Sequence, residues 1–284
     1  MGRTRSTGPG DGGSRRLREF STDRAATARR TTAQGVTRAL RVLEEFIKGP
    51  PYLGITDISG RVGLAPPVVQ RIVNSLAAAG FLERSDRTRK YSLGLKVIEL
   101  GATAETYNRL VAASRPVMHQ LNERTGEVVL LAVLDRRTWR GAYLLVLEGR
   151  QSASIRPGLQ RQGYLHASST RKVLLAFAAD DEIREVINTH GLPRLTPRTI
   201  TDPRALWTEV KLIRAKGFAV SRGEATIGTS GVAAPIRDRE GTVIAGLGIS
   251  MPDTRGSDER LAALSEQIVA AASEVTRRLQ QSAG

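Results

Sequence analysis

Apolar residues recur at intervals of three and four over residues 34–124, and short apolar runs replace this spacing from residue 128 onward. The first pattern is typical of helices and the second of strands. A first helix is expected over residues 34–48, because Gly49 and the two prolines after it end the helical pattern. The chain is therefore expected to begin with a helical part and to continue with a mixed α and β part.

The segment that follows the first helix predicts two more helices and a basic hairpin. Thr56 is the expected N-cap of a short helix, and Gly63 allows a tight turn after it. The next helix opens on Pro66 and Pro67, which suit a first turn because the N–H groups there have no intrahelical partner. Two short strands around an arginine-rich turn follow. These parts in this order predict a winged helix-turn-helix that binds DNA.

The helix that opens on the two prolines carries an apolar stripe for packing and a polar remainder for reading DNA. Side chains near the start of a recognition helix meet base edges in the major groove. Arg71 is expected to bind guanine or a phosphate, and Gln70 and Asn74 to bind adenine. Val68 is expected to pack on a thymine methyl group. The candidate DNA-binding residues of the helix and the wing are Pro67, Val68, Gln70, Arg71, Asn74, Arg84, Arg87, Arg89 and Lys90.

Residues 95–124 predict one or two helices, with Pro116 as a break. Beyond residue 128, apolar runs predict strands, and turn sequences between some of them set antiparallel pairs. Further helices are expected near residues 170–188, 203–216 and 257–280. The second domain is therefore predicted to be α/β or α+β.

Composition narrows the choice of partner and of chemistry. The 284 residues favour about two domains, and the formal net charge of +15 indicates an anionic partner, either nucleic acid or a membrane surface. The chain has no cysteine, which excludes thiol catalysis, disulfides and thiolate metal sites. With only three histidines, a histidine-rich metal cluster is not expected either. We therefore expect no metal and no cofactor.

Residues 1–32 are predicted to be a disordered basic arm. They hold eight arginines against Asp11, Glu19 and Asp23, a net charge of +5, and few large apolar residues. The arm is either a solvated leader or a flexible segment that touches phosphates. Neither a signal peptide nor a membrane span is found, so we expect a cytoplasmic protein with no membrane contact.

Seven stretches of the sequence resemble the IclR family of bacterial transcription regulators over about residues 34–280. They are "VTRALRVLEEF", "RIVNSLAAAGFLER", "YSLGLKVIELG", "LHASSTRKVLLAF", "GLPRLTPRTITDP", "IRAKGFAV" and "GVAAPIRDREGTVIAGLGIS", in the family's order and spacing. The resemblance implies an α+β chain that assembles as a homodimer or tetramer. Its implied parts are a winged helix-turn-helix over 33–94, a linker helix over 95–115 and a GAF-like effector-binding domain over 116–282.

The resemblance also implies which residues bind the effector, a small metabolite that modulates DNA binding. These are Ser168, Ser169, Thr170, Arg171, Ser221, Glu224, Gly231, Gly248 and Ser250. Family members often carry Gly at 171, an acidic residue at 221 and Cys at 231, so this chain is expected to have a roomier and more basic pocket for a bulkier carboxylate. The alternative is that Ser168 to Thr170 only cap a helix and that His166 is structural.

The DNA side departs from the family as well. The family's basic residue, Ser and Thr are replaced here by Pro66, Pro67 and Val68. Because the hydroxyls that bind phosphate at the helix entrance are missing, Arg71 and the wing are expected to position the protein, with the arm as a further candidate.

Taken together, the sequence predicts a sequence-specific repressor that binds a palindromic operator in double-stranded DNA and responds to a small organic-acid-like effector. One alternative is a non-specific basic DNA-binding protein. Another is a serine acyl-transfer enzyme, because Ser169 and Lys172 match an S-x-x-K pattern. The partner motifs of that enzyme class are missing, which argues against it.

Overall fold

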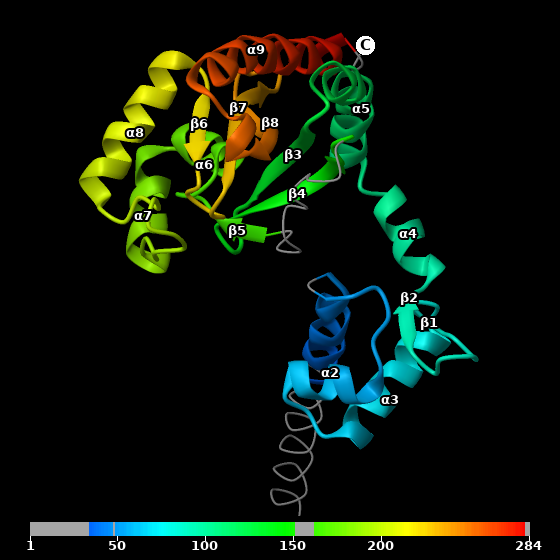
Figure 1. The fold of residues 1–284 in the computed structure, drawn as a ribbon. Helices are drawn as coiled ribbons and strands as arrows, with labels where there is room; N and C mark the ends of the chain where they lie inside the picture. The colour runs from blue at the N-terminus through cyan, green and yellow to red at the C-terminus, as the bar shows by residue number, and fades with distance from the viewer. Residues whose placement is uncertain (1–33, 48, 151–161, 282–284) are drawn as a thin grey trace, which may run out of the picture. The chain divides into compact units, whose positions relative to one another are not determined.

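A computed structural model describes residues 34–47, 49–150 and 162–281. The predicted arm, residues 1–32, lies outside these ranges. The chain divides between Gly101 and Ala102 into two compact units (Figure 1). Within the described ranges, no helix is long and apolar enough to cross a membrane.

The N-terminal unit contains the predicted helices and hairpin. A helix over residues 34–47 is followed by α2 and α3 and by the strands β1 and β2. Their bounds are Ile55–Val62, Pro66–Ala78, Leu82–Arg84 and Tyr91–Leu93. The two strands pair antiparallel, and Leu53 adds an isolated bridge to Tyr91. This arrangement confirms the winged helix-turn-helix.

A small apolar core holds this unit together. The predicted stripe of α3 contributes to it, with Val69 and Val73 fully buried and Ile72 and Leu76 packed beside them. Both prolines lie in the first turn of α3, as predicted. The prediction of Thr56 as N-cap of α2 is wrong, because the helix begins after Gly54, whose N–H donates to Asp57 Oδ2 at 2.9 Å. Asp57 thus makes the bond from the third helical residue back to the N-cap N–H, whereas glycine at the N-cap has no side chain for the reciprocal bond.

Two helices follow the wing, α4 (Leu95–Ala102) and α5 (Glu105–Thr125). The predicted break at Pro116 is wrong, since this proline lies inside α5 and the chain breaks at residues 103–104 instead. Helix α5 tolerates the lost hydrogen bond because Leu110, Val117, Met118 and Leu121 are buried in the C-terminal core, and each such side chain stabilises by about 1.5–3 kcal/mol.

The C-terminal unit is built on one antiparallel sheet of six strands in the order β5-β4-β3-β8-β7-β6. In chain order the strands are β3 (Val128–Asp135), β4 (Arg140–Leu147), β5 (Gln162–Tyr164), β6 (Ala219–Arg222), β7 (Thr229–Arg237) and β8 (Val243–Pro252). Strand β5 was not predicted from the sequence. Strands β5 and β6 form the two edges of the sheet.

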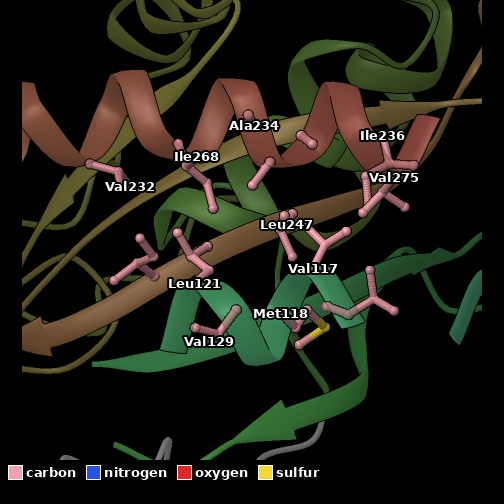
Figure 2. Packing of buried hydrophobic residues seen from close by; sticks show 14 of the residues in the cluster. Val117, Met118, Leu121, Val129, Val232, Ala234, Ile236, Leu247, Ile268 and Val275 are labelled. Atoms are coloured by element: carbon pink, nitrogen blue, oxygen red, sulfur yellow. The ribbon is translucent and has the colours of Figure 1, made fainter. Parts of the chain in front are cut away.

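One face of the sheet is covered by α5 and by the C-terminal helix α9 (Asp258–Gln281). Figure 2 shows this core, in which Ile268 and Val275 of α9 and Val117 and Leu121 of α5 pack with apolar side chains of β7 and β8. The residues of β7 on this face alternate with those on the other face, as the pleat of a strand requires.

The opposite face is covered by α6 (Ser169–Ala176), α7 (Asp180–His190) and α8 (Pro203–Lys216). A short 3-10 helix, η1 (Asp253–Arg255), follows β8. Every residue of α6 is buried, because the helix lies between the sheet and α8. Small residues on the sheet, Ala132, Ala219 and Ala233, make space for it. The polar residues of α6 are therefore placed inside the domain.

Candidate DNA-binding and effector sites

The polar side of α3 is open to solvent. Pro67, Arg71 and Asn74 are exposed, whereas Val68 and Gln70 are half-buried. Helix α3 starts after Ala65, which has an extended backbone and offers no capping side chain. The entrance of α3 therefore presents no hydroxyl to a phosphate, and the guanidinium of Arg71 is the cation closest to it along the helix.

Gln70 connects the predicted base-reading residues to the wing. Its side-chain Nε2 donates to Asn74 Oδ1 at 2.8 Å and lies 3.4 Å from the hydroxyl oxygen of Tyr91 on β2. Tyr91 is itself buried and pairs with Leu53 through two backbone hydrogen bonds. These contacts fix the rotation of α3 relative to the hairpin.

The wing is a compact basic turn. The backbone of Ser85 bonds to both Lys90 and Arg89, and Arg89 has a positive φ of 54° that closes the turn. The four predicted wing cations are all exposed, namely Arg84, Arg87, Arg89 and Lys90. Exposed cations on a short ordered hairpin are suited to bind the phosphate backbone beside the groove that the helix enters.

In the C-terminal unit, three predicted effector residues form one row across neighbouring strands. Ser221 of β6 pairs with Gly231 of β7, which pairs with Ser250 of β8. Gly248 lies two residues before Ser250, on the same face of the sheet. Four residues from three strands thus share one wall, which faces α6.

Helix α6 begins directly over this row. A Cβ atom added to Gly231 would lie 2.6 Å from the Ile249 carbonyl oxygen and 3.1 Å from Ser169 Oγ. A Cβ atom added to Gly248 would collide with the Thr170 methyl group. The extra room that the sequence predicted at Gly231 is therefore taken up by the helix and the neighbouring strand.

Ser168 occupies the N-cap position of α6 without acting as a cap. Its side chain makes no capping bond, and its Oγ is buried with no hydrogen-bond partner among the described residues. Its φ of 80° and ψ of 151° belong to a region that is essentially restricted to glycine. Ser168 thus directly precedes the first N–H groups of the helix, which have no intrahelical partners and carry partial positive charge.

Arg171 does not lie beside Ser221, although both were predicted to line one pocket. Its buried side chain runs along Gly141 and Gly163 toward the edge strand β5, with its guanidinium 5.1 Å from the ring centroid of Tyr143. Ser221 is on β6, the opposite edge of the same sheet. Arg171 therefore does not make the Ser221 side of the domain more basic.

The cation on the Ser221 side is Lys172, which the sequence did not single out as an effector residue. Its side chain is 2% exposed, and Nζ donates to Glu209 Oε1 at 2.7 Å, to the Val220 carbonyl at 2.7 Å and to Glu224 Oε1 at 2.6 Å. We call Lys172, Glu209 and Glu224 the charged trio. The only sequence signal for Lys172 was its match to an S-x-x-K pattern.

Burial raises the pKa of Glu224 above its usual value, and the Lys172 charge and hydrogen bond oppose this rise. The neighbouring charge of Glu209 raises the pKa further, whereas the adjacent Ser221 hydroxyl lowers it. The second carboxyl oxygen of Glu224, Oε2, is buried and has no hydrogen-bond partner in the described ranges. In those ranges no group of three or more His, Asp or Glu side chains is placed to hold a metal ion.

A connecting segment, residues 191–202, is fastened beside the charged trio. The hydroxyls of Thr196 and Thr199 each donate to a backbone carbonyl, of Gly223 and Glu224 respectively, at 2.6 Å.

His166 contacts the same segment from its other side. Its Nε2 lies 3.1 Å from the Pro193 carbonyl, which can only accept, so Nε2 carries the proton. Burial lowers the pKa of His166, the Pro193 bond opposes this, and the Arg140 cation adds to the lowering. His166 is thus a buried neutral histidine with a structural bond.

Two family models match the chain, one over each unit. A family model described as the bacterial transcriptional regulator IclR C-terminal domain matches residues 103–277, and one described as the IclR helix-turn-helix domain matches residues 35–86. The chain belongs to the IclR family. It is an IclR-type transcription regulator, with a helix-turn-helix in the N-terminal unit and a ligand-binding domain in the C-terminal unit.

Named relatives and solved structures of the IclR family cover most of the chain. The HTH-type transcriptional regulator BhcR of Paracoccus denitrificans is 34% identical over 247 residues, which are 86% of each chain. The regulator KdgR of Escherichia coli is 32% identical and covers 74% of this chain and 79% of its own. An IclR homolog from Microbacterium hydrocarbonoxydans, solved in complex with 4-hydroxybenzoate, has a TM-score of 0.76 at 29% identity, with 86% and 98% of the two chains covered.

Proposed function

We propose that this IclR-type regulator is a repressor that binds a palindromic operator as a homodimer or tetramer in the cytoplasm and that a small carboxylate effector controls its DNA affinity. It has no enzymatic activity. The observation that carries the effector part of the proposal is Ser168, whose hydroxyl is buried without a partner among the described residues at the start of α6. A buried polar atom of this kind requires a partner, and a bound ligand supplies one.

The chemistry at this position favours an anion. A helix N-terminus binds carboxylates through its free N–H groups and its dipole. The Ser168 and Ser169 hydroxyls add donors at the same place. The relative from Microbacterium hydrocarbonoxydans was solved with 4-hydroxybenzoate, which supports a small carboxylate as the class of effector.

On the DNA side, the predicted recognition residues of α3 and the wing cations are the proposed contacts. Two recognition helices of a dimer engage one face of the duplex when their half-sites are about 34 Å apart, one turn of DNA. Exposed apolar side chains on the N-terminal unit support a homodimer, because large apolar residues left in solvent mark interaction surfaces. They are Val36, Leu40, Ile47, Leu95, Ile98 and Leu100.

Helix α4 joins the two units and is the proposed transmitter of the effector signal. An effector acts only if it binds the DNA-competent and the DNA-incompetent arrangements with different affinity. A change in the separation of the two recognition helices is the simplest such difference, since both half-sites must be engaged together.

The acyl-transfer alternative is disfavoured by the contacts of Lys172. The three N–H bonds of its ammonium are all directed at Glu209, Glu224 and the Val220 carbonyl, and no hydrogen bond to Ser169 is found in the described part of the chain. A lysine that activates a serine must be within hydrogen-bond reach of it and must accept its proton.

The test is to select fragments of the source genome on the purified protein at about physiological salt, where non-specific phosphate binding is weak. The expected result is a few sites that share a palindrome, with affinity roughly 10³-fold or more above that for random DNA. Titration of the recovered operator complex with benzoate, 4-hydroxybenzoate and short aliphatic acids then tests the effector. Uniform recovery of the genome would support the non-specific alternative and refute the proposed repressor.

A further inference from the structure

The charged trio carries an excess negative charge into the domain interior. One ammonium, Lys172, faces two carboxylates, Glu209 and Glu224, so the trio has a net charge of −1 when all three groups are ionised. Lys172 has no N–H left for another acceptor, because all three are already used. An effector carboxylate therefore finds no free donor at the trio and is repelled by it.

Glu224 nevertheless has an unused hydrogen-bonding atom. Lys172 binds Oε1, whereas Oε2 is buried and lacks a hydrogen-bond partner among the residues described. A buried carboxyl oxygen without a partner destabilises a protein, which makes such atoms uncommon in the absence of a function. The Glu224 carboxyl lies beside Ser221, the first residue of the row on the sheet that faces α6.

The two ends of the candidate effector site thus differ in chemistry. The N-terminus of α6, with Ser168 and Ser169, favours a negative charge. Glu224, at the other end, disfavours a negative charge and needs a neutral or donating group. A ligand that satisfies both ends carries a carboxylate and a separate hydrogen-bonding group.

We propose that the effector is a hydroxy acid, whose carboxylate binds at the N-terminus of α6 and whose hydroxyl binds Glu224 Oε2. This inference rests on the proposed effector function of the same site. A hydroxyl both donates and accepts, so it pairs with Oε2 whether that oxygen carries a proton or not. An ammonium group only donates and pairs with the ionised carboxylate alone.

The test compares acids that differ by one hydroxyl, using the wild-type protein and its operator. The pairs are glycolate and acetate, lactate and propionate, 3-hydroxybutyrate and butyrate, and 3-hydroxybenzoate and benzoate. Affinity is measured by calorimetry and by the effect on operator binding. In at least one pair the hydroxy acid is expected to bind about tenfold tighter or more, as for a hydrogen bond to a charged group.

The variant Glu224→Ala is expected to reduce this hydroxyl preference to about onefold. The control Glu185→Ala changes an exposed glutamate of α7 and is expected to keep the preference. The comparison of ligand pairs with the wild-type protein tests the hydroxy-acid assignment even if Glu224→Ala does not fold.

The outcomes separate this inference from the proposed function. If acids bind and modulate DNA binding but the hydroxyl makes no difference in any pair, the hydroxy-acid assignment is wrong and the carboxylate effector stands. The same conclusion follows if the free amino acid alanine, which carries an ammonium group in place of the hydroxyl of lactate, binds better than lactate. If none of the acids binds, the proposed carboxylate effector is refuted, and the hydroxy-acid assignment with it.

Discussion

The Gln70 side-chain amide donates a hydrogen bond to Asn74 Oδ1 across one turn of α3, with 2.8 Å between the two atoms. This bond uses one donor of Gln70 and one acceptor of Asn74. It leaves Gln70 Oε1 as an acceptor and Asn74 Nδ2 as a donor on the same side of the helix. Adenine presents the complementary donor N6 and acceptor N7 in the major groove. The pair is therefore suited to read a single A·T base pair together.

Replacement of Gln70 by alanine is expected to relax sequence preference at one A·T position of the operator. A good bidentate contact discriminates against the wrong base by about 1–3 kcal/mol, which is roughly 5- to 150-fold in affinity. The measurement is the affinity of wild-type and Gln70→Ala protein for operators with every single-base change.

Arg87→Ala is the matched control on the wing, where an exposed cation is proposed to touch phosphate. It is expected to weaken the operator and a scrambled duplex alike and to lower the slope of log affinity against log salt by about 1. Equal weakening of all base variants by Gln70→Ala, as for Arg87→Ala, would show that Gln70 does not read a base.

The sequence predicted most helices and strands of this protein, but fewer of the contacts between them. The strong apolar period of residues 203–216 predicted α8 with the bounds that the structure has. Strand β5 was missed because its three residues, Gln162 to Tyr164, contain no apolar alternation to detect. Its pairing with β4 comes from tertiary structure rather than from local preference.

The predicted effector residues were only partly brought together. Arg171 and Lys172 are neighbours in the sequence, yet their side chains reach opposite edges of the sheet. Successive residues of a helix point about 100° apart, and only the packing of α6 decides which neighbour meets which strand. Glu209 joins the trio from α8, and no sequence motif connects it to Lys172.

Ser168 offers a test of strain and of effector binding at one position. Ser168→Gly is expected to be more stable than Ser168→Ala by about 1 kcal/mol, because both lack the hydroxyl but only glycine adopts this φ and ψ without strain. Both variants are expected to weaken the carboxylate effector. Urea unfolding followed by tryptophan fluorescence reports on the right unit, since both tryptophans, Trp139 and Trp207, lie in the C-terminal unit.

Two outcomes would contradict these expectations for Ser168. Equal stability of the glycine and alanine variants would show that the serine backbone is not strained. Unchanged effector affinity in both variants would remove the Ser168 hydroxyl from the effector site.

Gly248 provides a paired test of how closely α6 packs on the sheet. Gly248→Ala is expected to destabilise the C-terminal unit by about 1–3 kcal/mol, because the new Cβ collides with the Thr170 methyl group. Thr170→Ser removes that methyl group and is expected to recover most of the loss in the double variant. Gly231→Ala is the control, since its new Cβ meets the Ile249 carbonyl and Thr170→Ser gives it no relief. Additive effects of Gly248→Ala and Thr170→Ser would contradict this contact.

The burial of His166 determines how the stability of the folded protein changes with pH. Burial lowers its pKa in the folded protein, while the unfolded chain protonates near pH 6.5. The contribution of the neutral histidine is therefore complete above about pH 6.5 and is lost as the pH falls from there through the lower folded pKa. Each unit of pKa difference corresponds to about 1.4 kcal/mol.

The wild-type protein is accordingly expected to lose more stability than His166→Gln between pH 7.5 and pH 5.5, as measured by urea unfolding and tryptophan fluorescence. Glutamine keeps a donor for the Pro193 carbonyl, which holds the segment 191–202 beside Glu224, but it does not titrate. The comparison thus isolates the charge of the ring from the bond it makes. An equal pH dependence of the two proteins would contradict this expectation. It would mean that His166 is protonated as easily in the folded protein as in the unfolded chain.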